Sequence, residues 1–127
     1  MLGNKPALLR LERLIHPRVE HARRAFLRRH RAHKLVVVDV PLLFEKGGWR
    51  RVDLIAVVSA PAWKQARRVL KRSGMSRGRL EQVRALQLSD QIKRQRADFI
   101  IPTGGTLPQT RATVRRIVAC VRGGLRR

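Results

Sequence analysis

The sequence predicts an α/β fold in which a parallel sheet is flanked by helices. Residues 35–40 and 54–58 are rich in β-branched side chains, which is typical of strands buried on both faces of a parallel sheet. Apolar residues with helical spacing precede and follow these two runs, and a further strand between helices comes later in the chain, so strands alternate with helices. In such sheets the ligand lies beyond the carboxyl ends of the strands, where we expect the loops at 41–48 and 102–106.

The first part of the chain predicts two helices. Apolar residues keep helical spacing over residues 8–15, and His16 and Pro17 then interrupt the pattern. Pro17 suits the first position of a second helix, which fades in the basic stretch 28–34.

The rest of the chain continues the alternation of strands and helices. Pro61 is expected to begin a helix that stops at Ser73 and Gly74, and Thr106 opens a T-x-x-Q capping box for the last helix. Between them the pattern predicts a helix over residues 79–88, a polar segment over 89–96 and a third strand over 98–101. Residues 1–127 are therefore expected to form a single domain with strands in 35–60 and 97–127, and helices in 1–34 and 61–96.

The charge is strongly positive, with 30 Lys+Arg against 8 Asp+Glu and a formal net charge of +22. One interpretation is a basic, non-catalytic module that binds RNA or other polyanions, since arginines pair with phosphates. The other is solvated helix faces with anionic metabolites as ligands. The basic residues are spread along the chain, and Tyr is absent, so a base-stacking platform is poorly supplied.

Other compositional features narrow the class of protein. No apolar run approaches the ~20 residues of a membrane span, and the first 13 residues are too charged for a secretory signal. Cys120 is the single cysteine, so no disulfide framework forms and packing is its expected role. We therefore expect a cytoplasmic protein without a bound metal cluster.

Three patterns are candidates for chemistry. Asp39 ends a predicted buried strand, where it is either a Mg²⁺ carboxylate at a nucleotide site or a buried group that accepts backbone N–H bonds. Arg68 and Arg72 are four residues apart on a predicted helix, so they either grip phosphate oxygens or are solvated surface charges. Gly104 and Gly105 permit either close approach of a flat ligand or a plain turn.

The phosphate-binding motif G-x-x-x-x-G-K-[ST] is absent from the sequence. An α/β protein that binds nucleotides through its strand ends is expected to contain such a loop. The sequence therefore predicts part of a phosphotransferase rather than a complete enzyme.

The chain resembles the dephospho-CoA kinase family, the kinases that phosphorylate the ribose 3′-hydroxyl of dephospho-CoA with ATP. The motifs that carry this resemblance are spread over most of the chain and occur in the family's order. They are LERLIHPRV at 11–19, DVPLLFE at 39–45, Q-x₂-R-x₃-R at 65–72, Q-x₅-K-x₃-AD at 87–98 and IPTGG at 101–105. In the last motif Pro102 and Thr103 stand where the family has Asp and Asn.

The resemblance implies a P-loop kinase-like parallel sheet with ATP and Mg²⁺ as cofactors. Residues 1–34 would be helices on the dephospho-CoA side, and 61–96 would be lid-like helices. The site residues that it implies are His16, Pro17, Leu42, Phe44 and Glu45 toward dephospho-CoA, Arg68 and Arg72 over the ATP phosphates, and Thr103, Gly104 and Gly105 near adenine.

The resemblance also implies a gap. The family's P-loop strand and catalytic aspartate lie upstream of the first matched motif, and the P-loop strand would run between the strands at 36–40 and 54–58. Without it we expect no appreciable kinase activity, and the unpaired sheet edges predict direct pairing of these strands, self-association or marginal folding.

Overall fold

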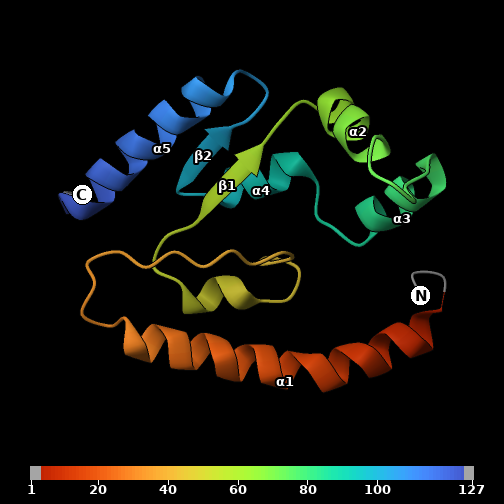
Figure 1. Cartoon of the computed structure of the whole chain (residues 1–127), viewed down its shortest axis with the longest axis horizontal. Helices are drawn as coiled ribbons and strands as arrows, with labels where there is room; N and C mark the ends of the chain where they lie inside the picture. The colour runs from red at the N-terminus through yellow and green to blue at the C-terminus, as the bar shows by residue number, and fades with distance from the viewer. Residues whose placement is uncertain (1–3, 125–127) are drawn as a thin grey trace. The chain divides into compact units, whose positions relative to one another are not determined.

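The structure is a computed structural model, which describes residues 4–124. The chain divides between Val38 and Asp39 into two compact units. The first consists mainly of one helix, and the second holds all the described strands and the remaining helices (Figure 1).

The first unit contains α1 (Lys5–Arg29), a single helix where the sequence predicted two. Asn4 caps it by accepting a hydrogen bond from the backbone N–H of Ala7 at 3.2 Å. Pro17 lies inside the helix, so the predicted break at His16 and Pro17 is wrong. An interior proline removes one backbone hydrogen bond and crowds the carbonyl four residues earlier, which commonly kinks or ends a helix, yet α1 continues through Pro17.

Residues 35–40 do not form the predicted strand. A strand requires a hydrogen-bonded neighbour, and in the described part of the chain the sheet has two strands, neither of which pairs with this segment. Val37 is 75% exposed, so the expected burial on both faces is also absent. The β-branched composition favours a strand, but pairing decides whether the strand exists.

The sheet consists of β1 (Ala56–Ser59) and β2 (Phe99–Pro102), which run parallel with Ala56 opposite Phe99. Both were predicted, with boundaries one or two residues earlier. Asp98 fixes the beginning of the pair, because its backbone N–H donates to the Ile55 carbonyl at 2.9 Å while its Oδ2 accepts from the Ile55 N–H at 2.8 Å. The expected α/β class with a parallel sheet is thereby confirmed.

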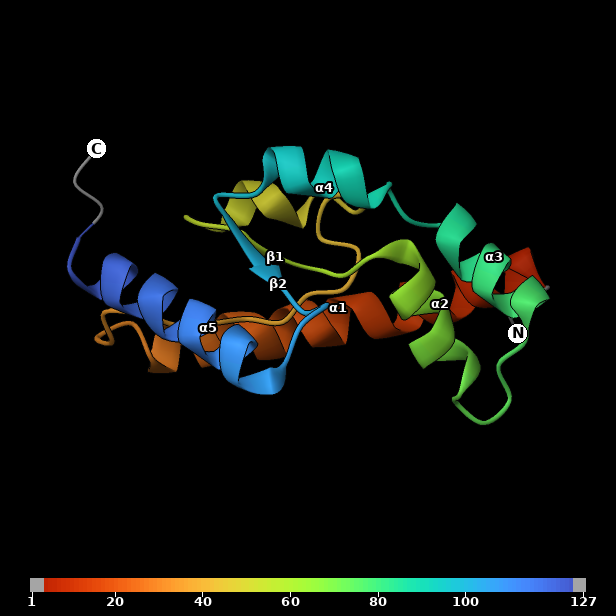
Figure 2. The ribbon, with the colours of Figure 1, turned by 90° about the horizontal axis from the view of Figure 1, so that it is seen from above.

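The described part of the second unit contains five helical elements, of which two flank the sheet. The five elements are η1 (Gly48–Arg51), α2 (Ala62–Leu70), α3 (Arg77–Ala85), α4 (Asp90–Arg96) and α5 (Leu107–Arg122). α4 contacts β1 and α5 contacts β2, on opposite faces of the strand pair (Figure 2). The predicted capping box of α5 is present, with Thr106 and Gln109 bonded reciprocally.

One helix was missed in the sequence. Residues 89–96 were expected to be a polar segment, yet α4 begins there because the Ser89 hydroxyl accepts a hydrogen bond from the Ile92 N–H at 3.3 Å. The side-chain cap satisfies a backbone donor that the first turn leaves free. Its apolar face is short, which is why periodicity did not reveal it.

The core of the described residues is small. Its buried members are Phe44, Val57, Leu80 and Ser59, whereas Val58 on β1 is 62% exposed. Cys120 is exposed, so the packing role expected for it is wrong. In the described part of the chain no helix is long and apolar enough to cross a membrane.

Candidate functional site

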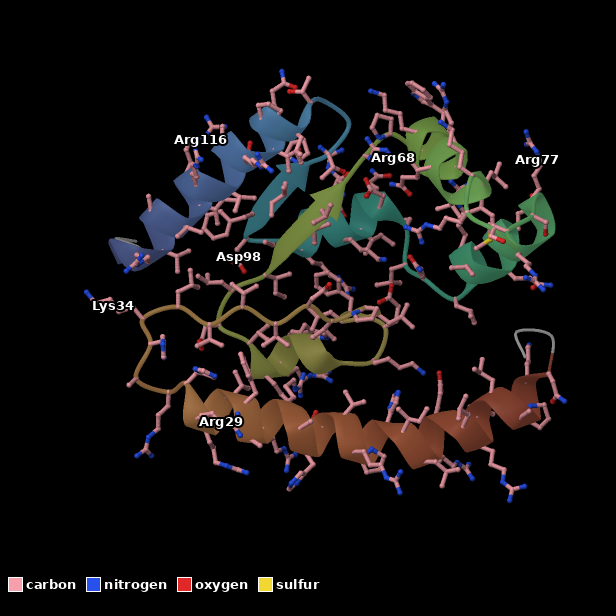
Figure 3. The ribbon with its side chains drawn as sticks, in the orientation of Figure 1. Arg29, Lys34, Arg68, Arg77, Asp98 and Arg116 are labelled. Carbon is pink, nitrogen blue, oxygen red and sulfur yellow. The ribbon has the colours of Figure 1, made fainter. Side chains whose placement is uncertain are left out.

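Two basic side chains of α2 bind the turn that follows β2. The Arg68 guanidinium donates to the Thr103 carbonyl at 2.7 Å, and the Lys64 ammonium donates to the carbonyl of Gly104. Lys64 and Arg68 are four residues apart, so they project from the same face of the helix. Arg68 is labelled in Figure 3, where it lies at the end of the strand pair. The helix and the turn, 35 or more residues apart in sequence, thus form one corner of the site.

The same corner is braced by the end of β1. The Ser59 carbonyl accepts from both the backbone N–H of Thr103 at 2.8 Å and its hydroxyl at 3.2 Å. Gln65 of α2 donates to the Ala60 carbonyl at 2.7 Å. These contacts place the beginning of α2 and the β2–α5 turn side by side at the carboxyl ends of the strands.

Gly104 allows the close approach of this turn to α2. A Cβ at Gly104 would lie 2.9 Å from Pro61 Cδ, a rigid ring atom. At Gly105 a Cβ would meet only the Gln109 amide, the end of a flexible side chain. The paired glycines therefore have different roles, and the close backbone approach expected at this turn is here an approach to Pro61.

A groove of about 620 Å³ opens beside the same turn, against α5. Its mouth carries two guanidinium groups, of which Arg116 donates to the Thr113 hydroxyl at 3.3 Å (Figure 3). The residues that line it are Pro102, Gly105, Gln109, Ala112, Thr113, Arg115 and Arg116. A mainly apolar groove with cations at its edge suits a flat ligand that carries negative charge.

The loop of residues 41–47 is held in an unusual conformation. Leu42 has a φ of +57°, in the left-handed backbone region that residues other than glycine rarely adopt. Such a conformation costs on the order of 1 kcal/mol and persists where the surroundings hold it. The next residues supply that hold, because Phe44 is buried and the Glu45 side chain is only 11% exposed.

Glu45 is bound to the segment between α3 and α4. Its Oε1 accepts from the Leu88 N–H at 2.8 Å and lies 3.3 Å from the Lys93 ammonium. Burial acts to raise the pKa of the Glu45 carboxyl, but the backbone donors and Lys93 together hold that pKa below its ordinary value of 4.5. The carboxylate is therefore ionised at neutral pH.

A second carboxylate lies at the end of β1. The buried Ser59 donates through its hydroxyl to both oxygens of Asp90, at 3.0 and 2.9 Å, and so fastens α4 to the strand. Sequence reasoning passed over Ser59, Asp90 and Lys64. Ser59 lies in a segment without a recognised motif, Asp90 occupies a variable position of the motif at 87–98, and Lys64 precedes the Q-x₂-R pattern by one position.

The structure brings together only some of the residues predicted from sequence. Arg68 meets the Thr103–Gly104 turn, whereas Arg72 is exposed beyond the end of α2 at Leu70. Asp39 is exposed and lies outside any strand, so the interpretation as a buried carboxylate is wrong. The contributions of Asp39 and Arg72 to ligand binding stay predictions.

His16 and Pro17 belong to the first unit, where both are exposed on α1. Leu42, Phe44 and Glu45 follow one another in the loop of the second unit. The assignment of these five residues to a shared dephospho-CoA wall stays a prediction.

These features define an α/β protein whose basic and polar groups gather at the carboxyl ends of parallel strands, the arrangement of nucleotide-binding α/β proteins. A family model described as dephospho-CoA kinase matches residues 1–109. The chain belongs to the dephospho-CoA kinase family, as its motifs predicted.

Named relatives agree with this assignment. The dephospho-CoA kinase of Zymomonas mobilis subsp. mobilis is 50% identical over 123 residues, which cover 97% of this chain and 62% of that protein. The dephospho-CoA kinase of Mesorhizobium japonicum is 49% identical over 125 residues, with 97% and 64% covered. The chain thus spans about three fifths of the length of these relatives.

A solved structure is also similar. The crystal structure of TT1252 from Thermus thermophilus superposes with a TM-score of 0.70 at 32% identity, over 91% of this chain and 60% of that one. The family model and the named relatives give no support to the alternative of an RNA-binding module.

Proposed function

We propose that this chain supplies the lid, the adenine-side turn and part of the substrate wall of a dephospho-CoA kinase. The reaction is the ATP-dependent phosphorylation of the ribose 3′-hydroxyl of dephospho-CoA, a step of coenzyme A biosynthesis. The observation that carries the proposal is the bond from Arg68 to the Thr103 carbonyl, which joins two family motifs at the strand ends.

ATP binds at the corner that α2 forms with the turn after β2. Arg68 and Arg72 neutralise its phosphates, since guanidinium groups pair with phosphate oxygens in a fork geometry. Thr103, Gly104 and Gly105 lie on the adenine side, where a groove of about 620 Å³ adjoins the turn.

Dephospho-CoA lies against the loop that carries Leu42, Phe44 and Glu45, and the family motif separately assigns His16 and Pro17, on α1, a role toward the same substrate. The left-handed Leu42 supports a binding role for this loop, because backbone strain concentrates at ligand sites. The charge of the chain favours capture of both anionic substrates.

Mg²⁺ fits this chain as a partner of the substrate phosphates. No group of three or more His, Cys, Asp or Glu side chains that could hold a metal occurs within residues 4–124. Asp39 offers one exposed carboxylate, and Mg²⁺ is commonly held by one or two carboxylates together with phosphates and water. When bound, the ion would neutralise charge that develops on the transferred phosphoryl group.

The 127-residue chain alone is expected to bind these substrates without appreciable turnover. Positioning by a phosphate loop and its Lys supplies much of the catalysis in such kinases, and the sequence contains no G-x-x-x-x-G-K-[ST]. Isothermal titration with ATP and with dephospho-CoA measures binding, and a coupled ATP assay measures turnover.

Arg68→Ala tests the phosphate role of Arg68. We expect it to weaken ATP binding about tenfold or more, because a charge-assisted contact is lost, and to weaken the binding of adenosine, which carries no phosphate, clearly less. Arg77→Ala, on α3, is the matched control for removing one positive charge. Equal ATP affinity in the wild type and Arg68→Ala would contradict the assignment of Arg68, and absence of all nucleotide binding would contradict the proposed function.

A further inference from the structure

The carboxylate of Glu45 is at the centre of a cluster that joins three separate segments of the second unit. Lys93, on α4, lies 3.3 Å from Glu45 Oε1 and also donates to the Gln87 side-chain oxygen at 3.2 Å. Leu88, the neighbour of Gln87, donates its backbone N–H to the same carboxylate. The loop of residues 41–47 is thereby bonded to the connection between α3 and α4 and to α4 itself.

A second contact runs beside the first. The guanidinium of Arg96 lies 6.0 Å from the ring centroid of Phe44, within the range of a cation–π interaction. Lys93 and Arg96 are three residues apart on α4 and so share a face, as neighbours on a helix do. Two consecutive loop residues therefore meet two cations of one helix face.

Burial strengthens the electrostatic contacts of Glu45. The side chains of Glu45 and Lys93 are 11% and 23% exposed, so solvent screens the pair less than a surface ion pair. Glu45 Oε2 is buried and has no hydrogen-bond partner in the structure. Because one oxygen is unsatisfied, the carboxylate depends on Leu88 and Lys93 for its stability, and the cluster has little tolerance for displacement.

The position of the cluster relates it to the lid. α2 and α3 contact each other, and Arg84 of α3 donates to the Ala62 carbonyl at 3.2 Å, so these two helices form one pair. α4 is fastened to β1 through Ser59 and Asp90. Residues 86–89 thus link a helix pair to a helix that is fixed on the sheet, and Glu45 binds this link at Leu88.

We propose that Glu45 is a positioning residue that couples the substrate loop to the base of the lid. Dephospho-CoA bound against the loop of residues 41–47 steadies Glu45, which holds residues 86–89 and through them the orientation of α3. α3 in turn supports the beginning of α2 through the bond from Arg84 to the Ala62 carbonyl. Arg68, on α2, is then presented to the ATP phosphates. This inference rests on the proposed function and assigns the Glu45 carboxylate to the link with the lid.

Hydrogen exchange on the full chain tests the coupling, with dephospho-CoA as the probe. Glu45→Gln keeps an acceptor for the Leu88 N–H and removes the attraction for Lys93, and Lys93→Met removes the ammonium. We expect each change to speed exchange of residues 86–93 about tenfold, because a charge-assisted contact is lost. Lys93→Arg should restore the slow exchange. Glu20→Gln, which affects ion pairs within α1, is the matched control and should leave this segment unchanged.

Exchange measured with bound dephospho-CoA distinguishes coupling from a merely structural role of Glu45. In the wild type, dephospho-CoA should slow exchange in α2 and α3. In Lys93→Met, calorimetry should show binding within about threefold of the wild type while the slowing is lost, and in Glu45→Gln the slowing should also be lost. The double variant should be no worse than either single variant, because the two side chains act as one pair.

Three results would overturn the proposal. If dephospho-CoA binds the wild type without slowing exchange in α2 and α3, or slows it equally in the variants, the coupling is refuted and the proposed function stands. If Glu45→Gln speeds exchange uniformly over the chain, Glu45 is structural only. If dephospho-CoA does not bind the wild type at all, the proposed function fails together with the inference.

Discussion

Single side chains in this chain act mainly by holding backbone segments that are distant in sequence. Arg68, Lys64 and Glu45 each bind a backbone group at least 35 residues away. Motif spacing identified Arg68 and Glu45, because the family pattern names them, but it indicated ligand contacts. The backbone partners depend on chain geometry, which spacing does not encode.

The ionisation of Glu45 predicts an acid-sensitive contribution to stability. Its pKa is held below 4.5 in the folded chain despite burial, so the unfolded state binds a proton more readily. The contribution is fully present above about pH 5 and is lost as pH falls through the lowered folded pKa. We expect the stability difference between the wild type and Glu45→Gln to be constant above pH 5 and to shrink below it. Thermal melts at pH 3–7 would show this, and a difference that grows toward low pH would contradict it.

The backbone at Gly104 leaves no room for a side chain. Gly104→Ala would bring a Cβ to 2.9 Å from Pro61 Cδ, so the turn or the beginning of α2 must shift, at a cost of about 1–3 kcal/mol in the free energy of unfolding.

Gly78 is the matched control for that substitution. It lies in α3, and an added Cβ would have no atom within 4 Å, so Gly78→Ala should stabilise the chain by up to about 1 kcal/mol. Urea denaturation of both variants gives the comparison, and equal effects of the two changes would refute the steric argument.

At the scale of helices and strands, the structure differs from the sequence-based predictions mainly where long-range contacts determine whether an element forms. β1, β2, α2, α3 and α5 were each predicted from local periodicity, and α5 also from its capping box. Residues 35–40 form no strand because a strand needs a hydrogen-bonded neighbour. α1 continues through Pro17, although an interior proline commonly kinks or ends a helix.

The register of the strand pair depends on Asp98. Asp98→Ala removes the acceptor for the Ile55 N–H, and we expect a loss of about 1 kcal/mol in the free energy of unfolding with faster exchange of the Ile55 amide. Asp98→Asn keeps an acceptor oxygen and should retain most of the stability. These results would give Asp98, a residue of the family motif, a structural role. Equal stability of Asp98→Ala and the wild type would contradict that role.

At the scale of the whole molecule, the net charge of +22 dominates the behaviour in solution. In the described residues β1 and β2 each have one edge without a neighbouring strand, so self-association through these edges stays a prediction. Charge repulsion opposes it, and added salt would favour it by screening.

Binding to polyanions is expected to have the opposite dependence on salt. Affinity for a random RNA should fall steeply between about 50 and 200 mM salt, without sequence preference, because counterion release drives such binding. Fluorescence anisotropy with two unrelated RNA sequences measures both features. Selective binding of one sequence at physiological salt would instead support the RNA-binding alternative.

The sequence by itself determined the α/β class, most helices, both paired strands and the family, because these follow from local periodicity, capping and ordered motifs. The tertiary structure decided which strand-forming segments are strands, and that Arg68, Glu45 and Asp98 bind backbone groups far along the chain. Strand pairing and side-chain partners depend on segments that folding brings together, and local sequence carries no record of which segments will meet.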